Sequence, residues 1–322
     1  MKKLLISFSS IFAFLTVSCS TNAPKVDTTI KNNDDKLYKN KYVDQLLNLY
    51  LSDTKLKDSY INDQENVPDS RFNELKYALT FYPIFIHRSL DRHVGRQHFE
   101  IIQKGKKAIE LILKNDWYWF LNNITQFRYI FNPYGDFYKE FDDDTKLFNA
   151  VEKEFGLTTS IKNNKIEGFI RLPLEESNKI NQEIKDVYLS KESFYLIFDK
   201  NKVVKIWKFE NNKKVEFQIS SDIFIFKNTD SIEQQLTELE KTIFQKRKEE
   251  YNKSFEIANK EKKEEDKKQK IKNLQDKSND RSFMKFHETD QYNERLKEAL
   301  TEINKKELKI ARYSLGGVYE QE

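Results

Sequence analysis

The residues with the clearest chemistry are three arginines, Arg88, Arg92 and Arg96, which recur every four residues. In a helix this spacing places them on one face. Guanidinium groups bind phosphate oxygens through two hydrogen bonds at once, and a row of them spans several phosphates. Three lysines then extend the basic segment: Lys104, Lys106 and Lys107. We therefore predict a helix face that binds polyanions such as nucleic acids.

Nothing in this segment predicts readout of base sequence. Binding would be non-specific and would weaken steeply with salt. Since the whole chain has a formal net charge of only +4, any basic character must be local. Two alternatives stay open: the arginines can be paired with acids elsewhere in the fold, or the ridge can bind a glycosaminoglycan or an anionic membrane surface.

Other residues with chemical potential form weaker patterns. His87 and His98 share a helix face, but His93 points elsewhere, and no Cys, Asp or Glu completes a zinc set at the usual spacing. Residues 142–144 are three aspartates without the glycine and glutamate of a calcium loop. Phosphate-binding glycine loops and nucleophile motifs are missing as well. We expect no metal, no cofactor and no catalysis.

The N-terminus has the layout of a lipoprotein signal peptide. Two lysines precede an apolar run at residues 4–17, and Cys19, the only cysteine, follows Ser18 directly. We predict that residues 1–19 are the signal, that Cys19 is lipidated, and that residues 20–36 are a flexible tether. A secreted protein cut near Ser18 and an uncleaved anchor are the alternatives. No later run approaches the roughly 20 apolar residues of a membrane span.

A helical domain at residues 37–156 is expected to position the basic face. Apolar residues recur at helical spacing in residues 37–60, 71–82 and 108–131. The last of these segments contains the aromatic run Trp117, Tyr118, Trp119 and Phe120. Because its neighbours are apolar, we expect this run to lie in the core rather than to act as a surface for stacking. A short helix should follow residues 142–144 and end at Gly156.

Residues 157–229 change to a period of two, which predicts an antiparallel β region with one short helix at residues 175–189. A hairpin is expected around Asn163 and Asn164. A meander should follow, with strands at residues 193–198, 203–209, 215–220 and 223–226.

Residues 230–277 have the pattern of one long polar helix with an apolar stripe at Ile232, Leu236, Leu239 and Ile243. Such a helix is about 70 Å long, so we expect it to project. A last helix at about residues 288–313 would pair with it, or the stripe would close in a homodimer, and residues 314–322 should fray. The predicted fold class is mostly α with a small antiparallel β meander, carrying a long coiled-coil-like helical arm at residues 230–313.

The lipobox sequence TVSC at residues 16–19, the Asn/Lys-rich tether and the body rich in Ile, Lys, Asn and Phe resemble the surface lipoproteins of Borrelia spirochaetes. The order of helical half, strand region and long charged helix is most similar to that of the paralogous family 12 lipoproteins. This resemblance implies a coiled-coil arm like that of SMC proteins, non-specific DNA binding and a lipid anchor in the outer membrane, on the cell surface or the periplasmic face. The alternative is an adhesin or immune-evasion lipoprotein whose strand region or arm contacts a host protein.

Overall fold

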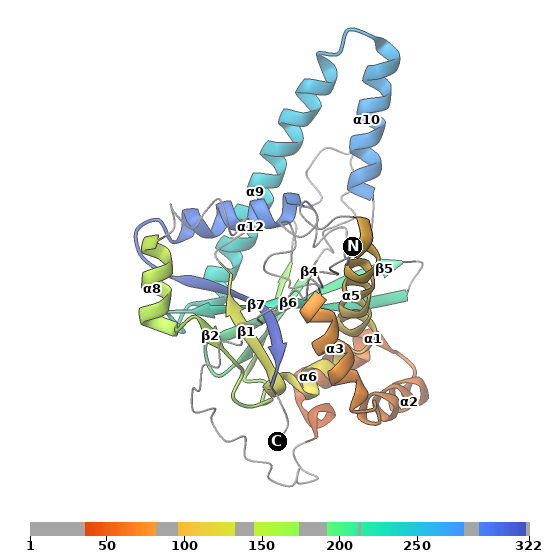
Figure 1. Cartoon of the computed structure of the whole chain (residues 1–322), viewed down its shortest axis with the longest axis vertical. Helices are drawn as coiled ribbons and strands as arrows, with labels where there is room; N and C mark the ends of the chain where they lie inside the picture. Colours follow the sequence, from red (N-terminus) through yellow and green to blue (C-terminus); the bar gives the residue numbers. More distant parts are fainter. Residues whose placement is uncertain are drawn as a thin grey trace, which may run out of the picture. The chain divides into compact units, whose positions relative to one another are not determined.

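The computed structural model describes residues 36–81, 96–132, 145–173, 192–211, 214–279 and 290–319. The predicted signal peptide and Cys19 lie outside these ranges, as do Arg88, Arg92 and the helix expected at residues 175–189. Residues Leu37–Glu322 form one compact unit. Its centre is an antiparallel sheet of seven described strands in the order β2-β1-β7-β6-β5-β4-β3 (Figure 1). The fold class is therefore α+β, as predicted, with a larger sheet than expected.

The meander from β3 to β6 confirms the period-two pattern of the sequence. Each strand pairs with the next, although β6 is one continuous strand where two were predicted. The strands are β1 Phe127–Phe131, β2 Thr158–Thr159, β3 Gly168–Pro173, β4 Glu192–Phe198, β5 Lys202–Asn211, β6 Lys214–Phe226 and β7 Ile310–Val318.

The hairpin predicted around Asn163 is wrong, because β2 pairs with β1 and β3 pairs with β4. The segment between β2 and β3, residues 160–167, is bound by the β4–β5 turn instead. Asp199 in that turn accepts hydrogen bonds from the Lys162 backbone N–H at 2.8 Å and from the Asn163 side chain at 3.3 Å. Asp199 and Lys200 have φ of 47° and 68°, which suits a tight turn between twisted strands.

One face of the sheet is covered by helices from the first half of the chain. They are α1 Lys41–Tyr50, α2 Thr54–Glu65, α3 Ser70–Phe81, α5 Arg96–Asn115 and α6 Trp117–Asn122, with short 3-10 turns η2 Leu37–Lys39 and η4 Ile124–Gln126. α3 packs against α5 and β7, while α5 packs against β6. The separate helix α8, Thr145–Phe155, confirms the prediction and ends at Gly156, whose φ is 78°.

The helix predicted at residues 108–131 is wrong in its second half. α5 ends at Asn115, α6 is a short separate helix, and Phe127–Phe131 is strand β1. Burial in β1 alternates, with Phe127, Tyr129 and Phe131 turned into the core. An apolar run this short fits either period, and its pairing with β7 decides the outcome.

The opposite face of the sheet is covered by α9, Ile232–Asn259, and α12, Asp290–Ile303. The apolar stripe of α9 is buried as the sequence predicts. The prediction of a single long helix is wrong, however, because the chain turns at residues 260–263 and α10, Glu264–Asn279, runs back from that turn in the opposite direction (Figure 1). Three acidic residues in the first turn of α10 favour a helix start there. α9 is about 42 Å long, so no long coiled-coil arm is evident in the described residues.

The end of the described chain also differs from the prediction. Helix α12 ends at Ile303, and residues 310–318 form β7 between β1 and β6 rather than a helix followed by a frayed tail. Asn304 makes the transition: its side chain accepts from the Lys309 backbone N–H at 2.8 Å and donates to the Ile310 carbonyl at 2.8 Å. Gly316 permits close packing on β1, since a Cβ there would lie 2.3 Å from Cδ1 of Ile130.

Candidate anion-binding surface

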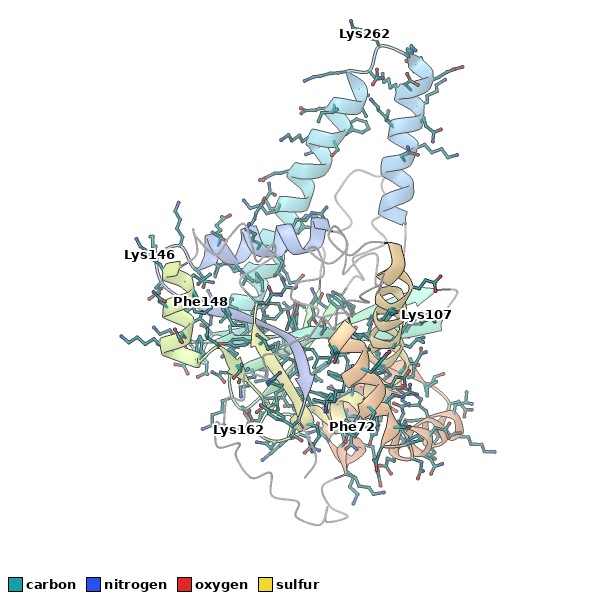
Figure 2. The ribbon with its side chains drawn as sticks, in the orientation of Figure 1. Phe72, Lys107, Lys146, Phe148, Lys162 and Lys262 are labelled. Atoms are coloured by element: carbon teal, nitrogen blue, oxygen red, sulfur yellow. The ribbon has the colours of Figure 1, made fainter. Side chains whose placement is uncertain are left out.

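Helix α5 carries the described part of the predicted basic face. Ile109, Ile112 and Leu113 are buried toward the sheet, so the other side of the helix faces outward. Lys104 and Lys107 are exposed on that outward side. The side chain of Lys107 is labelled in Figure 2.

Only the backbone is described for the remaining two predicted residues of this helix, Arg96 and Lys106. At about 100° per residue, position 96 falls about 20° from position 107 and about 80° from position 104. Position 106 falls about 100° from position 107, on the side that also holds Leu113. The helix therefore brings positions 96, 104 and 107 to one face, which they share with the exposed Glu100, and places 106 on another.

The charge on α5 is strongly unbalanced. Its five basic residues outnumber its two acidic residues, an excess of three: Arg96, Lys104, Lys106, Lys107 and Lys114 against Glu100 and Glu110. One of these cations is compensated, since Lys114 forms an ion pair with Glu216 of β6 at 2.9 Å. The local excess is nearly as large as the formal net charge of +4 of the whole chain.

Helix α3 extends this surface with an exposed aromatic ring. Arg71 at the start of α3 contacts Asp116, just beyond the end of α5, at 3.3 Å, so the two adjacent helices run antiparallel. Counting six residues along each helix from this contact, about 9 Å, places Tyr77 level with residue 110. Tyr77 is 64% exposed and Leu111 is 42% exposed. We name Tyr77, Lys104, Lys107 and Leu111 the α3–α5 surface.

Sequence reasoning missed Tyr77 and Leu111. The signal was present, because Tyr77 does not share the helical stripe of Phe72, Leu75 and Leu79. A large ring off the stripe of a helix that packs on one side must face outward. Its position beside the lysines needs the antiparallel packing of α3 on α5, which no local pattern reveals.

The aromatic run of α6 lies in the core, as predicted. All residues from Trp117 to Leu121 are buried, and Trp117 packs edge-on against Tyr50 with ring centroids 5.6 Å apart. Tyr60 and Phe217 join the same cluster. Burial raises the pKa of the Tyr60 phenol well above its usual range. These rings cannot stack on an external ligand, since the fold already encloses them.

Two groups of buried charges tie the helices and strands together. Glu240 of α9 accepts hydrogen bonds from Lys205 Nζ, at 2.6 Å, and from the Tyr195 hydroxyl. This contact fixes α9 on β4 and β5. Glu240 stands four residues after Leu236, within the apolar stripe, and Lys205 alternates in step with Val203 and Trp207, so both positions carried a sequence signal that was missed.

The second group links β6 and β7 to Asn132, the residue that follows β1. Arg312 of β7 donates to Asp222 Oδ2 of β6 from Nε at 2.9 Å and from Nη2 at 2.8 Å. Ser314 Oγ donates to Asp222 Oδ1 and accepts from the Asn132 side-chain amide at 2.8 Å. These contacts lie in the interior of the fold and serve to fix the sheet.

Within the described ranges, no group of three His, Cys, Asp or Glu side chains is placed to hold a metal ion. A search of the same residues for a helix with the length and apolar character of a membrane span finds none.

Comparison with known proteins gives a family match. Residues 20–270 fit the model of a family described as aromatic cluster surface protein. The matched range holds α3, α5, α6 and the aromatic cluster, together with the strands from β1 to β6. No curated protein and no solved structure matches the chain.

Proposed function

From the premise that this chain belongs to the aromatic cluster surface protein family, we propose that it is a lipid-anchored surface protein that binds DNA without sequence preference. The binding site is the basic outward side of α5, with position 96, Lys104 and Lys107 as its contacts. We assign binding rather than catalysis to this surface.

This proposal is supported chiefly by the two exposed lysines, Lys104 and Lys107, on the outward side of α5. Cations on one outward face attract the phosphate backbone over the screening length of about 8 Å at physiological salt. Phosphate contacts release condensed counterions, which supplies binding free energy independent of base sequence. Arg92 and Arg88, four and eight residues before Arg96, extend the same periodicity in the sequence.

The anchor is the part of the proposal that rests on sequence. The family match begins at residue 20, directly after Cys19, so the shared body starts where the lipidated chain would start. The family name implies a cell-surface protein. The sequence predicts a flexible tether at residues 20–36, and a flexible chain of that length has a root-mean-square span of about 20–25 Å. We also propose that the chain is related to the Borrelia family 12 lipoproteins and that its lipid anchors it in the outer membrane.

A host-protein ligand is the second candidate. It is favoured by Ile257 near the α9–α10 turn, which is 57% exposed, since an exposed aliphatic side chain among charged residues suits a protein partner. A protein contact at that turn would show little dependence on salt compared with a polyanion contact.

The test is fluorescence anisotropy of residues 20–322 with a random-sequence DNA duplex. Two variants remove the predicted contacts: Lys104→Ala/Lys107→Ala, and the triple change of Arg88, Arg92 and Arg96 to Ala. The matched control is Lys146→Ala/Lys162→Ala, which removes two exposed lysines that lie away from Lys107 (Figure 2). We expect weaker binding in both α5-side variants and unchanged binding in the control. Equal weakening in all three would mean that net charge alone, and no particular face, attracts DNA.

A further inference from the structure

We propose that the edge strand β3 pairs with β3 of a second copy of this chain, antiparallel across a two-fold axis, so that the two sheets join into one. This interaction surface goes beyond the proposed function and does not depend on DNA binding.

The two ends of the described sheet differ in length. At one end β2 has only two residues, Thr158 and Thr159, and it pairs with β1. At the other end β3 pairs with β4 over all six of its residues, and no described strand lies on its outer side. Along an antiparallel strand every second residue points its backbone N–H and C=O away from the neighbouring strand. β3 therefore presents the longer edge to which a further strand can be added.

β3 lacks the features that usually keep a sheet edge from pairing. Natural edge strands are blocked by lysines, prolines, bulges or inward-pointing charges. From Gly168 to Leu172 the sequence is GFIRL, without lysine or proline, and it pairs with β4 in continuous register. Its one charged residue, Arg171, forms an ion pair with Glu192 of β4. Pro173 stands at the last position of the strand. The edge is therefore largely apolar, and its cation is compensated.

The side chains of this edge still have surface that a further strand can cover. Phe169 and Ile170 are half-buried and point to opposite faces of the sheet. Phe169 packs on the core under the N-terminal helices, and Ile170 packs on the core under α9 and α12. The Arg171 side chain is 51% exposed. Strand addition would thus bury apolar side-chain area as well as form backbone hydrogen bonds.

The sequence of β3 is complementary to itself about an axis through Ile170. In that register Ile170 lies opposite Ile170 of the second copy, and Phe169 lies opposite Arg171. Gly168 then lies opposite Leu172, so all five residues of GFIRL are paired and no like charges meet. An axis through Arg171 would place two arginines directly opposite each other, and a shift by one residue would bring side chains of opposite faces together. This self-complementarity favours a second copy as the occupant.

The experiment measures the mass of residues 20–322 by sedimentation equilibrium over a range of protein concentrations. A single strand pair is a small interface, so the dimer should be weak and concentration-dependent. Wild type is compared with Ile170→Val, which keeps an apolar β-branched residue at the axis, and with Ile170→Lys, which places two lysines opposite each other there. Circular dichroism checks that each variant keeps the native fold.

Disulfide cross-linking gives a second readout at the same position. Opposite residues on antiparallel strands have Cα atoms about 4.5–5.5 Å apart, which a disulfide can span. Because Cys19 is the only cysteine of the chain, residues 20–322 contain none, and Ile170→Cys introduces a single thiol. The matched control is Lys146→Cys, at an exposed position of α8.

We expect wild type and Ile170→Val to form dimers as concentration rises, and Ile170→Lys to raise the dissociation constant by about tenfold or more. On oxidation Ile170→Cys should form a covalent dimer, whereas Lys146→Cys should remain mostly monomeric. A wild type that is monomeric at every concentration, or cross-linking of Ile170→Cys no greater than that of Lys146→Cys, would overturn the inference. A dimer that a folded Ile170→Lys variant forms as tightly as wild type would do so too, because its interface would lie elsewhere.

Discussion

Replacing Arg312 by methionine tests whether the buried ion pair with Asp222 holds the C-terminal strand in the sheet. The two side chains are only 3% and 1% exposed, and Asp222 Oδ2 accepts two hydrogen bonds from the guanidinium group. β7 has no sequence neighbour in the sheet, since β6 and β1 lie far upstream. The pair is therefore one of the few polar contacts that specify where this strand pairs.

The expected loss of stability in Arg312→Met follows from the burial of the ion pair. Removing one partner of a buried pair leaves the other charge without compensation and costs about 3–5 kcal/mol. Methionine fills most of the volume of the arginine stem, so little of this cost comes from a cavity. At about 2.1 cal/mol/K of unfolding entropy per residue, the compact unit Leu37–Glu322 has an unfolding entropy of roughly 0.6 kcal/mol/K, so the thermal midpoint should fall by about 5–8 °C.

The assay is urea unfolding of residues 20–322, followed by circular dichroism, for Arg312→Met, Asp222→Asn and the double variant. The double variant should be more stable than Arg312→Met, because asparagine removes the uncompensated charge. Lys227→Met is the control, since its ion pair with Glu154 spans 3.7 Å on the surface and is worth at most about 1 kcal/mol. The reasoning is refuted if Arg312→Met costs no more than this control, or if Asp222→Asn lowers its stability further.

Three further predictions concern the interior. Both side-chain polar atoms of Gln218 are buried without a hydrogen-bond partner among the described residues. Gln218→Met should therefore raise the free energy of unfolding by about 1–3 kcal/mol, and a lower urea midpoint of this variant would contradict the prediction. Gly316→Ala should lower the free energy of unfolding by about 1–3 kcal/mol because its Cβ would clash with Ile130. In Gly317→Ala the new Cβ meets its nearest atom at 3.4 Å, so this variant should lose less stability. Equal losses in thermal melts of the two variants would contradict the packing argument. Burial raises the folded-state pKa of four phenols above the unfolded value of about 10: Tyr60, Tyr118, Tyr129 and Tyr313. The stability that these phenols contribute is therefore present below about pH 10 and is lost as pH rises beyond it. Absorbance at 295 nm should show their ionisation only together with unfolding, and complete ionisation of a protein with native circular dichroism would be contrary evidence.

The sequence predicted elements whose signal is local. The β3–β6 meander has alternating apolar residues and turn residues between strands, and α8 has an apolar stripe that ends at a glycine with positive φ. The buried stripe of α9 and the buried position of Trp117 follow from the same kind of pattern. Each of these features is determined by residues within a few positions of one another.

The elements that the sequence did not predict depend on contacts between residues far apart in the chain. β1 and β7 are short apolar runs whose strand conformation comes from pairing across more than 180 positions. The turn at residues 260–263 was not predicted because charged residues alone fit a continuous helix as well. In the candidate site, the lysines were found from charge spacing, but Tyr77 joins them only through the antiparallel packing of α3 on α5.

The most direct test of the central claim, that the outward side of α5 binds DNA phosphates, is the slope of log affinity against log salt for wild type and Lys104→Ala/Lys107→Ala. Each lost phosphate contact on duplex DNA should reduce the magnitude of this slope by about 0.9, so the double variant should lose up to about 1.8 while Lys146→Ala/Lys162→Ala keeps the wild-type slope. A slope near zero for the wild type, or an equal slope in the Lys104→Ala/Lys107→Ala variant, would contradict the account.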